Sequence, residues 1–404
     1  MKQSFFLKPP TPSGRLRQLL RPPHAPLRSY VYRKRAPNTD LCLLLTVLLL
    51  STLGTLMIFS AGYAYATFRY DDPTYFIRKQ TVWLILGIAV MFFVSRIRVS
   101  FFEDSASLLY LLTVGLLILV LIVGFTGNGA QRWISIGPLT IQPSELAKLT
   151  LVLMLAKYFS VYHDLSTNKK HAQTAFWYGT VYPLLFLMVI VILVMLQKHL
   201  SCIIILGLIG LLVILVSGIK TTYIAFFTAL GATGVTCFAL FTDYTKERIT
   251  VWQNPEMYRL TGGWQTLQGL MAIGSGGLFG VGFGNSVLKY CYISEPANDM
   301  IFTVLCEESG FFGAVFVLLL FALLCARGYT IALRAPTIFS RITAFGISTK
   351  MAIQVLLNVA VVTNTIPNTG ISLPFFSYGG SSLLMLFVEM GILLSISREA
   401  TIKK

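Results

Sequence analysis

Long continuous runs of apolar residues, separated by short polar segments, dominate the chain. A helix needs about 20 apolar residues to cross the roughly 30 Å hydrocarbon core of a bilayer, and the runs are close to that length. A membrane β-barrel would instead show segments of about ten residues in which polar and apolar positions alternate. The pattern predicts an all-α polytopic membrane protein with about ten transmembrane helices. We expect these helices near residues 41–61, 76–95, 107–126, 145–161, 179–197, 199–217, 222–242, 300–325, 345–366 and 373–397.

The composition agrees with this fold class. The 404 residues are 55% hydrophobic and only 12% charged, and the mean hydropathy is +0.73. An ordinary soluble domain carries about twice that fraction of charged residues. The chain is therefore far too apolar to be a soluble protein of this length.

The net charge of +16 raises the question of nucleic-acid binding. Residues 1–39, however, hold nine Lys and Arg residues and no acidic residue, and further basic residues follow the inner ends of the predicted spans. The positive-inside rule then places both termini in the cytoplasm. Arg78 and Lys79, at the outer end of the second span, depart from the rule. We expect a topology signal and no nucleic-acid partner.

The domain organisation follows from these spans. Residues 1–39 form a basic, Pro-rich cytoplasmic tail that we expect to be flexible, residues 40–398 form the transmembrane domain, and residues 399–404 form a short cytoplasmic tail. A long extracytoplasmic loop, 243–299, joins helices 7 and 8 and is too long for a simple connector. No C-x-x-C pair occurs among the six cysteines, so neither a disulfide framework nor a thiolate metal site is indicated.

The candidate chemistry centres on the end of this loop, where Asp299 precedes the eighth helix. A carboxylate there would meet water at the membrane edge, and Asp299 is our candidate catalytic residue. It could equally cap the helix, a role typically worth about 1 kcal/mol. Nine glycines between residues 262 and 284 match no nucleotide-binding motif. They would let the backbone lie flat on the membrane or approach a ligand closely.

A second polar group lies between the third and fourth spans. Glu145 and Lys148 are three residues apart on one face of the fourth helix, where they form either a structural ion pair or a site for a polar head group. Arg132 and Trp133 also allow two interpretations. Trp133 could anchor the chain at the interface beside a snorkelling Arg132, or Arg132 could face phosphate oxygens.

Other polar residues lie within or between spans. Residues 367–382 hold two prolines and three glycines, which predicts a broken helix or re-entrant turn that protein or water must cover. Tyr378 and Ser381 in this segment could line a lipid entry route or simply pack. We expect the membrane-embedded carboxylates to have polar partners, and His199 to be a hydrogen-bonded loop residue rather than a titrating group. These carboxylates are Glu307, Glu308 and Glu389.

Several of these motifs, taken in order, resemble the bacterial FtsW/RodA/SpoVE family, the SEDS proteins of shape, elongation, division and sporulation. The resemblance covers the chain from about residue 40 to its end, and residues 282–289 are more similar to the FtsW and SpoVE branches than to RodA. The motifs are Arg132-Trp133, Gln142-Pro-Ser-Glu-Leu-Ala-Lys148, Gly276-Gly-Leu-Phe-Gly-Val-Gly282, Asn285-Ser286, Glu295-Pro296 with Asp299, Glu307-Glu308, and Leu373-Pro-Phe-Phe-Ser-Tyr-Gly-Gly-Ser-Ser382.

The resemblance implies an inverting peptidoglycan glycosyltransferase that polymerises lipid II at the outer face of the bacterial cytoplasmic membrane, during cell division or sporulation. The implied partners are a class B penicillin-binding protein and other cell-division membrane proteins, and the implied location is the division septum. No cofactor is certain, and a divalent cation, Mg²⁺ or Mn²⁺, stays open. The implied catalytic residue is Asp299. The implied substrate-binding residues are Arg132, Trp133, Glu145 and Lys148, with Lys289, Tyr378 and Ser381 as further candidates.

Two departures from the family pattern are visible. This chain has Lys198-His199 with Ser201 where the family often has Pro-Asp with Gly, so no role is carried over to that turn. It also has Asn298 where the family has Thr, which leaves the carboxylate of Asp299 untouched.

The chemistry itself needs only one carboxylate, because a general base suffices for a single displacement and diphosphate is already a good leaving group. Arg132 and Lys148 would neutralise that diphosphate, with Glu145 orienting Lys148. Two other function classes stay open, a lipid II flippase or transporter and a non-enzymatic divisome scaffold. A transporter would show an internal repeat and charges near the midplane, whereas the distinctive polar residues here cluster at the outer face.

Overall fold

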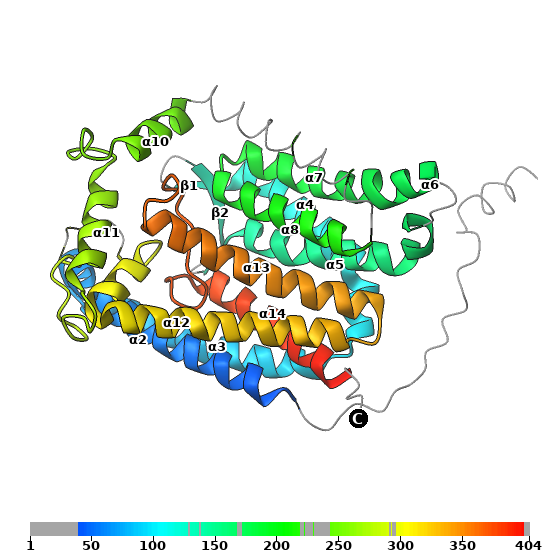
Figure 1. Ribbon diagram of the computed structural model, residues 1–404, viewed down its shortest axis with the longest axis horizontal. Coiled ribbons are helices and arrows are strands. Elements are labelled where there is room, and N and C mark those ends of the chain that lie inside the picture. The colour runs from blue at the N-terminus through cyan, green and yellow to red at the C-terminus, as the bar shows by residue number, and fades with distance from the viewer. Residues whose placement is uncertain are drawn as a thin grey trace, which may run out of the picture. The chain divides into compact units, whose positions relative to one another are not determined.

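The computed structural model describes residues 39–127, 130–136, 139–167, 172–218, 222, 229, 243–290, 292 and 296–399. Long helices run alongside one another in this part of the chain (Figure 1). They are α2 (Leu41–Tyr70), α3 (Tyr75–Arg96), α4 (Val99–Val123), α5 (Pro143–Ser166), α6 (Ala172–Phe176) with the π-helical turn η1 (Trp177–Val181), α7 (Tyr182–Leu196), α8 (Leu200–Val216), α12 (Ile301–Arg334), α13 (Ile338–Val362) and α14 (Gly380–Glu399).

The predicted membrane-spanning character is confirmed for the described residues. Seven helical stretches are long and apolar enough to cross a membrane, and the shorter Leu200–Val216 is apolar as well. Helix α5 is not among the seven, yet it has 24 residues and most of them are buried against neighbouring helices. The span expected at 222–242 lies outside the described residues, as do the predicted tails at 1–39 and 400–404, apart from residues 39, 222 and 229.

Small residues bring the helices close together. Helix α14 packs along α3, and α12 packs between α2 and α13. At Gly54 of α2, an added Cβ would lie 2.2 Å from the carbonyl oxygen of Phe375. At Gly87 of α3, it would lie 2.1 Å from the ring of Phe387. Gly54 therefore lets α2 lie against the segment before α14, and Gly87 lets α3 lie against α14 itself.

A small antiparallel sheet was not predicted from the sequence. It consists of β1 (Phe125–Gly127), β2 (Ala130–Ile136) and β3 (Leu139–Ile141), in the order β1-β2-β3. Phe125 pairs with Trp133, and Ile134 pairs with Ile141. The sheet turns the loop between α4 and α5 into a fixed support for Arg132 and Trp133.

The long loop predicted at 243–299 contains two helices, α10 (Asp243–Gln253) and α11 (Trp264–Ser275), which lie at the same end of the helices as the sheet (Figure 1). Trp252 of α10 donates from Nε1 to the carbonyl oxygen of Asn364, at a distance of 2.9 Å. The loop is thereby tied to the chain that follows α13.

The predicted break before the last span is confirmed. Residues 363–379 are not helical, and α14 begins at Gly380 rather than near residue 373. Phe375 is buried with a positive φ of 63°. The side chain of Asn358 on α13 donates to the carbonyl oxygen of Ile371 across 2.6 Å. Protein groups therefore cover this non-helical backbone, as a membrane protein requires.

The glycine-rich segment has a different role from the two that we expected. Its backbone lies against a break in α12 at Gly310, where φ is 66° and ψ is −167°. The amides of Val281 and Gly282 donate to the carbonyl oxygens of Glu307 and Glu308, each across 3.0 Å. A Cβ at Gly280 would lie 2.2 Å from the carbonyl oxygen of Glu308. A side chain at Gly280 would collide with the backbone of α12, so glycine is needed at this position for the contact.

Candidate active site

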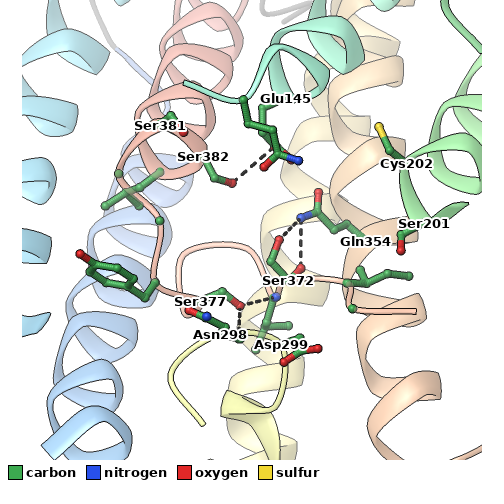
Figure 2. Close-up of a pocket in the computed structure, with 18 of the residues that line it drawn as sticks. Glu145, Ser201, Cys202, Asn298, Asp299, Gln354, Ser372, Ser377, Ser381 and Ser382 are labelled. Atoms are coloured by element: carbon green, nitrogen blue, oxygen red, sulfur yellow. Dashed lines mark hydrogen bonds between the residues drawn. The ribbon is translucent and has the colours of Figure 1, made fainter. Parts of the chain in front are cut away.

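A cavity of about 1310 Å³ lies among the sheet, the turn before α12, the segment 363–379 and the adjoining helix ends. Residues far apart in the sequence line it. Figure 2 shows Asn298 and Asp299 on one side of this cavity and Glu145 with Ser382 on the opposite side. The cavity holds every candidate site residue except Lys289: Asp299, Arg132, Trp133, Glu145, Lys148, Tyr378 and Ser381.

Asp299 is held by its backbone. Asn358 donates from Nδ2 to the carbonyl oxygen of Asp299 across 3.0 Å, and Ser377 donates to that of Asn298 across 2.7 Å (Figure 2). The amide of Tyr378 donates to the carbonyl oxygen of Ala297 across 2.8 Å. The turn is thus fixed from two elements, and Asp299 lines the cavity.

The capping alternative for Asp299 is not what the structure shows. Helix α12 begins at Ile301, and the residue at its N-cap position is Met300 rather than Asp299. Gly370 lies beside the carboxylate, since a Cβ there would be 3.5 Å from Oδ2 of Asp299. The φ of Gly370 is +68°, a conformation that glycine adopts readily and other residues adopt at a cost.

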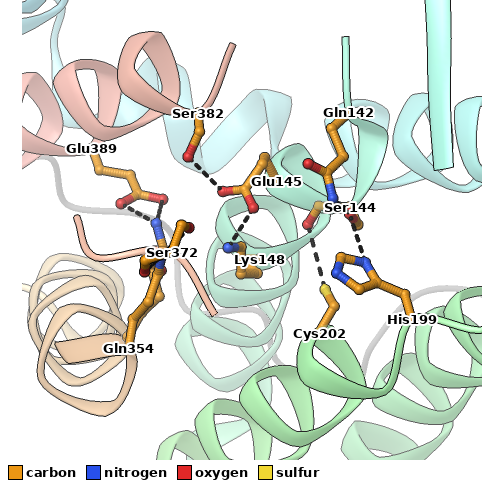
Figure 3. Close-up of polar contacts among 11 residues, drawn as sticks. Gln142, Ser144, Glu145, Lys148, His199, Cys202, Gln354, Ser372, Ser382 and Glu389 are labelled. Carbon is orange, nitrogen blue, oxygen red and sulfur yellow. Dashed lines mark hydrogen bonds and ion pairs between the residues drawn. The ribbon is translucent and has the colours of Figure 1, made fainter. Parts of the chain in front are cut away.

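Glu145 and Lys148 form an ion pair at the start of α5. Lys148 donates from Nζ to Oε1 of Glu145 across 2.7 Å, and the two residues are only 2% and 6% exposed. Ser382 of α14 donates to the other carboxylate oxygen across 3.4 Å (Figure 3). Burial of either charge alone would be costly, so the pairing explains why both can lie there.

A further buried pair lies beside the first. Lys350 of α13 donates to both carboxylate oxygens of Glu389 on α14, each across 2.8 Å. Glu389 lies on one side of Glu145 and Lys148 in Figure 3, and its charge acts on Lys148. The sequence analysis expected a partner for Glu389 but did not identify Lys350.

His199 lies on the other side of the ion pair, in the turn between α7 and α8. Its Nδ1 is 3.4 Å from the hydroxyl of Ser144, which also accepts from Gln142 across 3.1 Å (Figure 3). Burial, with the positive charges of Arg132 and Lys148, lowers the pKa of His199 to about 3. The imidazole is therefore neutral at physiological pH. It is a hydrogen-bonded loop residue, as predicted.

The cavity has an excess of positive charge. Its described lining includes the acidic side chains of Asp299 and Glu145 against five basic ones. Arg132 donates to the carbonyl oxygen of Lys198, which fixes the guanidinium against the α7–α8 turn. The five basic residues are Arg78, Lys79, Arg132, Lys148 and Arg248. Such a lining suits an anion next to a single catalytic carboxylate.

Three comparisons with known proteins bear on this site. The model of the cell cycle protein family FtsW/RodA/SpoVE matches residues 40–402. The chain belongs to this family.

Stage V sporulation protein E of Bacillus subtilis (strain 168) is 38% identical over 368 residues, which are 91% of this chain and 98% of that protein. The probable peptidoglycan glycosyltransferase FtsW of Thioalkalivibrio sulfidiphilus (strain HL-EbGR7) is 36% identical over 369 residues, 90% of each chain.

Solved structures agree with the family assignment. A chain from a structure described as "Structural coordination of polymerization and crosslinking by a peptidoglycan synthase complex" has a TM-score of 0.75 and 29% identity, and the match covers 91% of this chain and all of that one. The rod shape determining protein RodA of Thermus thermophilus has a TM-score of 0.67 and 29% identity, over 90% of this chain and 98% of RodA. The resemblance that the motifs indicated is therefore confirmed.

Lys289 is the candidate that the structure places elsewhere in this FtsW/RodA/SpoVE protein. It is 2% exposed and donates to Glu308 across 2.9 Å and to Ser60 across 3.0 Å. Glu307 accepts from the backbone amide of Val287 across 2.9 Å. Both glutamates thus have the polar partners that we expected, and Lys289 belongs to this buried cluster rather than to the cavity.

Three of the basic residues that line the cavity were not predicted from the sequence. Arg78 and Lys79 depart from the positive-inside rule, and that departure was the signal that could have identified them. Arg248 gave no such signal, because it reaches the cavity from α10 and donates to the carbonyl oxygen of Asn368, which is distant in sequence.

In the described part of the chain, no group of three or more His, Cys, Asp or Glu side chains offers a metal site.

Proposed function

We propose that this member of the FtsW/RodA/SpoVE family is a peptidoglycan glycosyltransferase. It polymerises lipid II into glycan strands at the outer face of the bacterial cytoplasmic membrane, during cell division or sporulation. The names of its FtsW relatives support the reaction class. The observation that carries the proposal is that Asp299 shares one cavity with Arg132 and Lys148.

The proposed reaction is a single displacement. The acceptor hydroxyl attacks the anomeric carbon of the donor sugar, a new C–O bond forms, and the bond from that carbon to the diphosphate oxygen breaks with inversion. The hydroxyl proton passes to the carboxylate of Asp299, which acts as general base. No second carboxylic acid is needed, because the diphosphate leaves without protonation.

The basic residues serve the leaving group. Arg132 presents a planar set of donors that matches phosphate oxygens, and Lys148 adds a second positive charge. Glu145 holds Lys148 in position by the 2.7 Å contact. Trp133, Tyr378 and Ser381 would contact the head group or the lipid at the cavity wall. A divalent cation bound by the diphosphate is compatible with this arrangement and stays a prediction.

The phenol of Tyr378 would act as a hydrogen-bond donor. Burial, followed by the effects of Tyr75 and Tyr70, raises the pKa of Tyr378 to about 12. The hydroxyl therefore keeps its proton over the whole physiological range and can donate to a sugar or phosphate oxygen.

We also propose a class B penicillin-binding protein as the cross-linking partner, with other cell-division membrane proteins nearby at the septum. The match to a chain of a peptidoglycan synthase complex supports such a partner. The basic residues at the ends of α3, α12 and α14 support a cytoplasmic face at that end of the helices, with both termini inside.

A transporter of lipid II is the second candidate, because Lys350 and Glu389 form a charged pair within two spans. One experiment separates the two functions. The purified chain, with its cross-linking partner in liposomes, is incubated with fluorescent lipid II. A ladder of growing glycan strands is expected. Translocation of lipid II without a ladder would support the transporter and contradict the enzyme.

A further inference from the structure

A second cavity, of about 220 Å³, adjoins the first. Asn298 and Tyr378 line both, so these two residues form a common wall. The described residues that line the second cavity come from α2, the start of α3, the turn before α12 and the segment before α14. They are Gly62, Tyr65, Tyr70, Phe76, Pro296, Ala297, Asn298 and Tyr378.

The second cavity is largely aromatic. The ring of Phe76 lies 4.9 Å from that of Tyr378 at an interplanar angle of 80°, and 6.0 Å from that of Tyr70 at 85°. Phe76 can take this place only because residue 62 is glycine, where a Cβ would lie 2.8 Å from the Phe76 ring. The edge-to-face contacts are a favourable aromatic geometry, so the rings are held in place before any ligand binds.

Tyr70, at the rim, is supported by the neighbouring side chain of Tyr75, which Lys79 contacts in turn. Its ring stacks on that of Tyr75 at 3.9 Å and 7°. The ammonium of Lys79 lies 4.0 Å from the centre of the Tyr75 ring and donates to its hydroxyl. Tyr70 is nevertheless 44% exposed. A rigid aromatic face at the rim of a cavity is a ready contact surface for a ligand.

The two cavities differ in charge. Five basic side chains line the first, whereas none of the described residues that line the second is charged. An anionic diphosphate therefore belongs in the first cavity, and a neutral group fits the second. The amide of Asn298 and the hydroxyls of three tyrosines make the second cavity amphipathic, which suits a sugar ring better than an acyl chain.

We propose that the second cavity is a subsite for an uncharged N-acetyl sugar ring of the acceptor glycan. Asn298 lines both cavities and Asp299 lines the first, so a ring against the Asn298–Tyr378 wall would lie next to the cavity that holds the proposed base. This inference rests on the proposed function, in which Asp299 deprotonates the acceptor hydroxyl. It adds the location of the second substrate, in a cavity that adjoins the one lined by Arg132 and Lys148.

Binding is tested first, without catalysis. The probe is chitotetraose, a neutral β-1,4-linked tetramer of N-acetylglucosamine that carries no lipid, diphosphate or peptide. Saturation-transfer NMR with the purified full chain in detergent should detect contact, and Tyr70→Ala should weaken binding at least about fivefold. Tyr63→Ala is the matched control, because Tyr63 is a similarly exposed tyrosine on α2 that is not part of the cavity. Equal binding by both variants, or no binding by the wild type, would overturn the proposal.

Polymerisation gives the second readout. With lipid II as substrate, Tyr70→Ala should raise KM about tenfold and leave kcat within about twofold, because the contact aids binding rather than chemistry. Tyr70→Phe keeps the ring and should stay close to wild type. If Tyr70→Ala has a normal KM in an active enzyme, the subsite is wrong while the proposed function stands. If the wild type makes no glycan, the function is wrong, and the chitotetraose measurement still judges the subsite.

Discussion

Lys148 and Glu145 meet across 2.7 Å at the edge of the cavity that holds Asp299, and both side chains are nearly inaccessible to solvent. Removal of one partner leaves an unpaired buried charge, which typically costs about 3–5 kcal/mol. We expect Lys148→Met to lower both the thermal stability of the purified chain and its polymerisation activity.

The double variant Glu145→Gln with Lys148→Met separates the structural effect from the functional one. Replacement of both charges should restore much of the stability, because no charge is left unpaired. Polymerisation should stay low, because the positive group at the diphosphate is still missing. Recovery of full activity in the double variant would show that the pair is only structural.

His199 should make stability depend on pH. Its pKa in the folded chain is about 3, below the ordinary value of 6.5, so the unfolded chain takes up the proton first. The contribution of neutral His199 is present above pH 6.5 and is lost progressively as the pH falls towards 3. Between pH 7 and pH 5 we expect a loss of about 2 kcal/mol.

Thermal unfolding of wild type and His199→Gln at the two pH values measures this loss. The variant should lose less stability on acidification than the wild type. Identical pH dependence in His199→Gln and wild type would contradict the buried neutral imidazole.

Lys289 should matter for folding and not for substrate binding. It lies in the cluster with Glu308 and Ser60, away from the cavity. Lys289→Met should destabilise the chain by about 3–5 kcal/mol, because Glu308 is left buried without its cation. At a temperature where the variant is folded, its KM for lipid II should equal that of wild type. If the folded variant had a much higher KM for lipid II than wild type, Lys289 would be part of the binding site after all.

The sequence predicted the spans well, because a continuous apolar run has few alternatives to a membrane helix. It also predicted the break before α14, because proline interrupts the hydrogen bonds of a helix and glycine has a low helix propensity. The sheet that carries Arg132 and Trp133 was missed, since strands as short as Leu139–Ile141 carry almost no periodic signal.

The site could be predicted only in part, because sequence order says little about which helices are neighbours. Glu145 and Lys148 share one helical face, so their pairing follows from spacing alone. Lys350 and Glu389 are 39 residues apart and pair only because α13 packs against α14. Lys289 was placed wrongly in the site group for the same reason. Its motif is close to Asp299 in sequence, yet its side chain turns to α2 and α12.

The most direct test of the central claim concerns Asp299. Glycan ladders from fluorescent lipid II are compared for wild type, Asp299→Asn and the control Glu256→Gln, an exposed carboxylate outside the cavity. Asp299→Asn keeps the size of the side chain, and the contact from Asn358 is made to the backbone, so the variant should fold normally. We predict a loss of at least about 10²-fold in polymerisation for Asp299→Asn and none for Glu256→Gln. Normal ladders from folded Asp299→Asn would contradict the account.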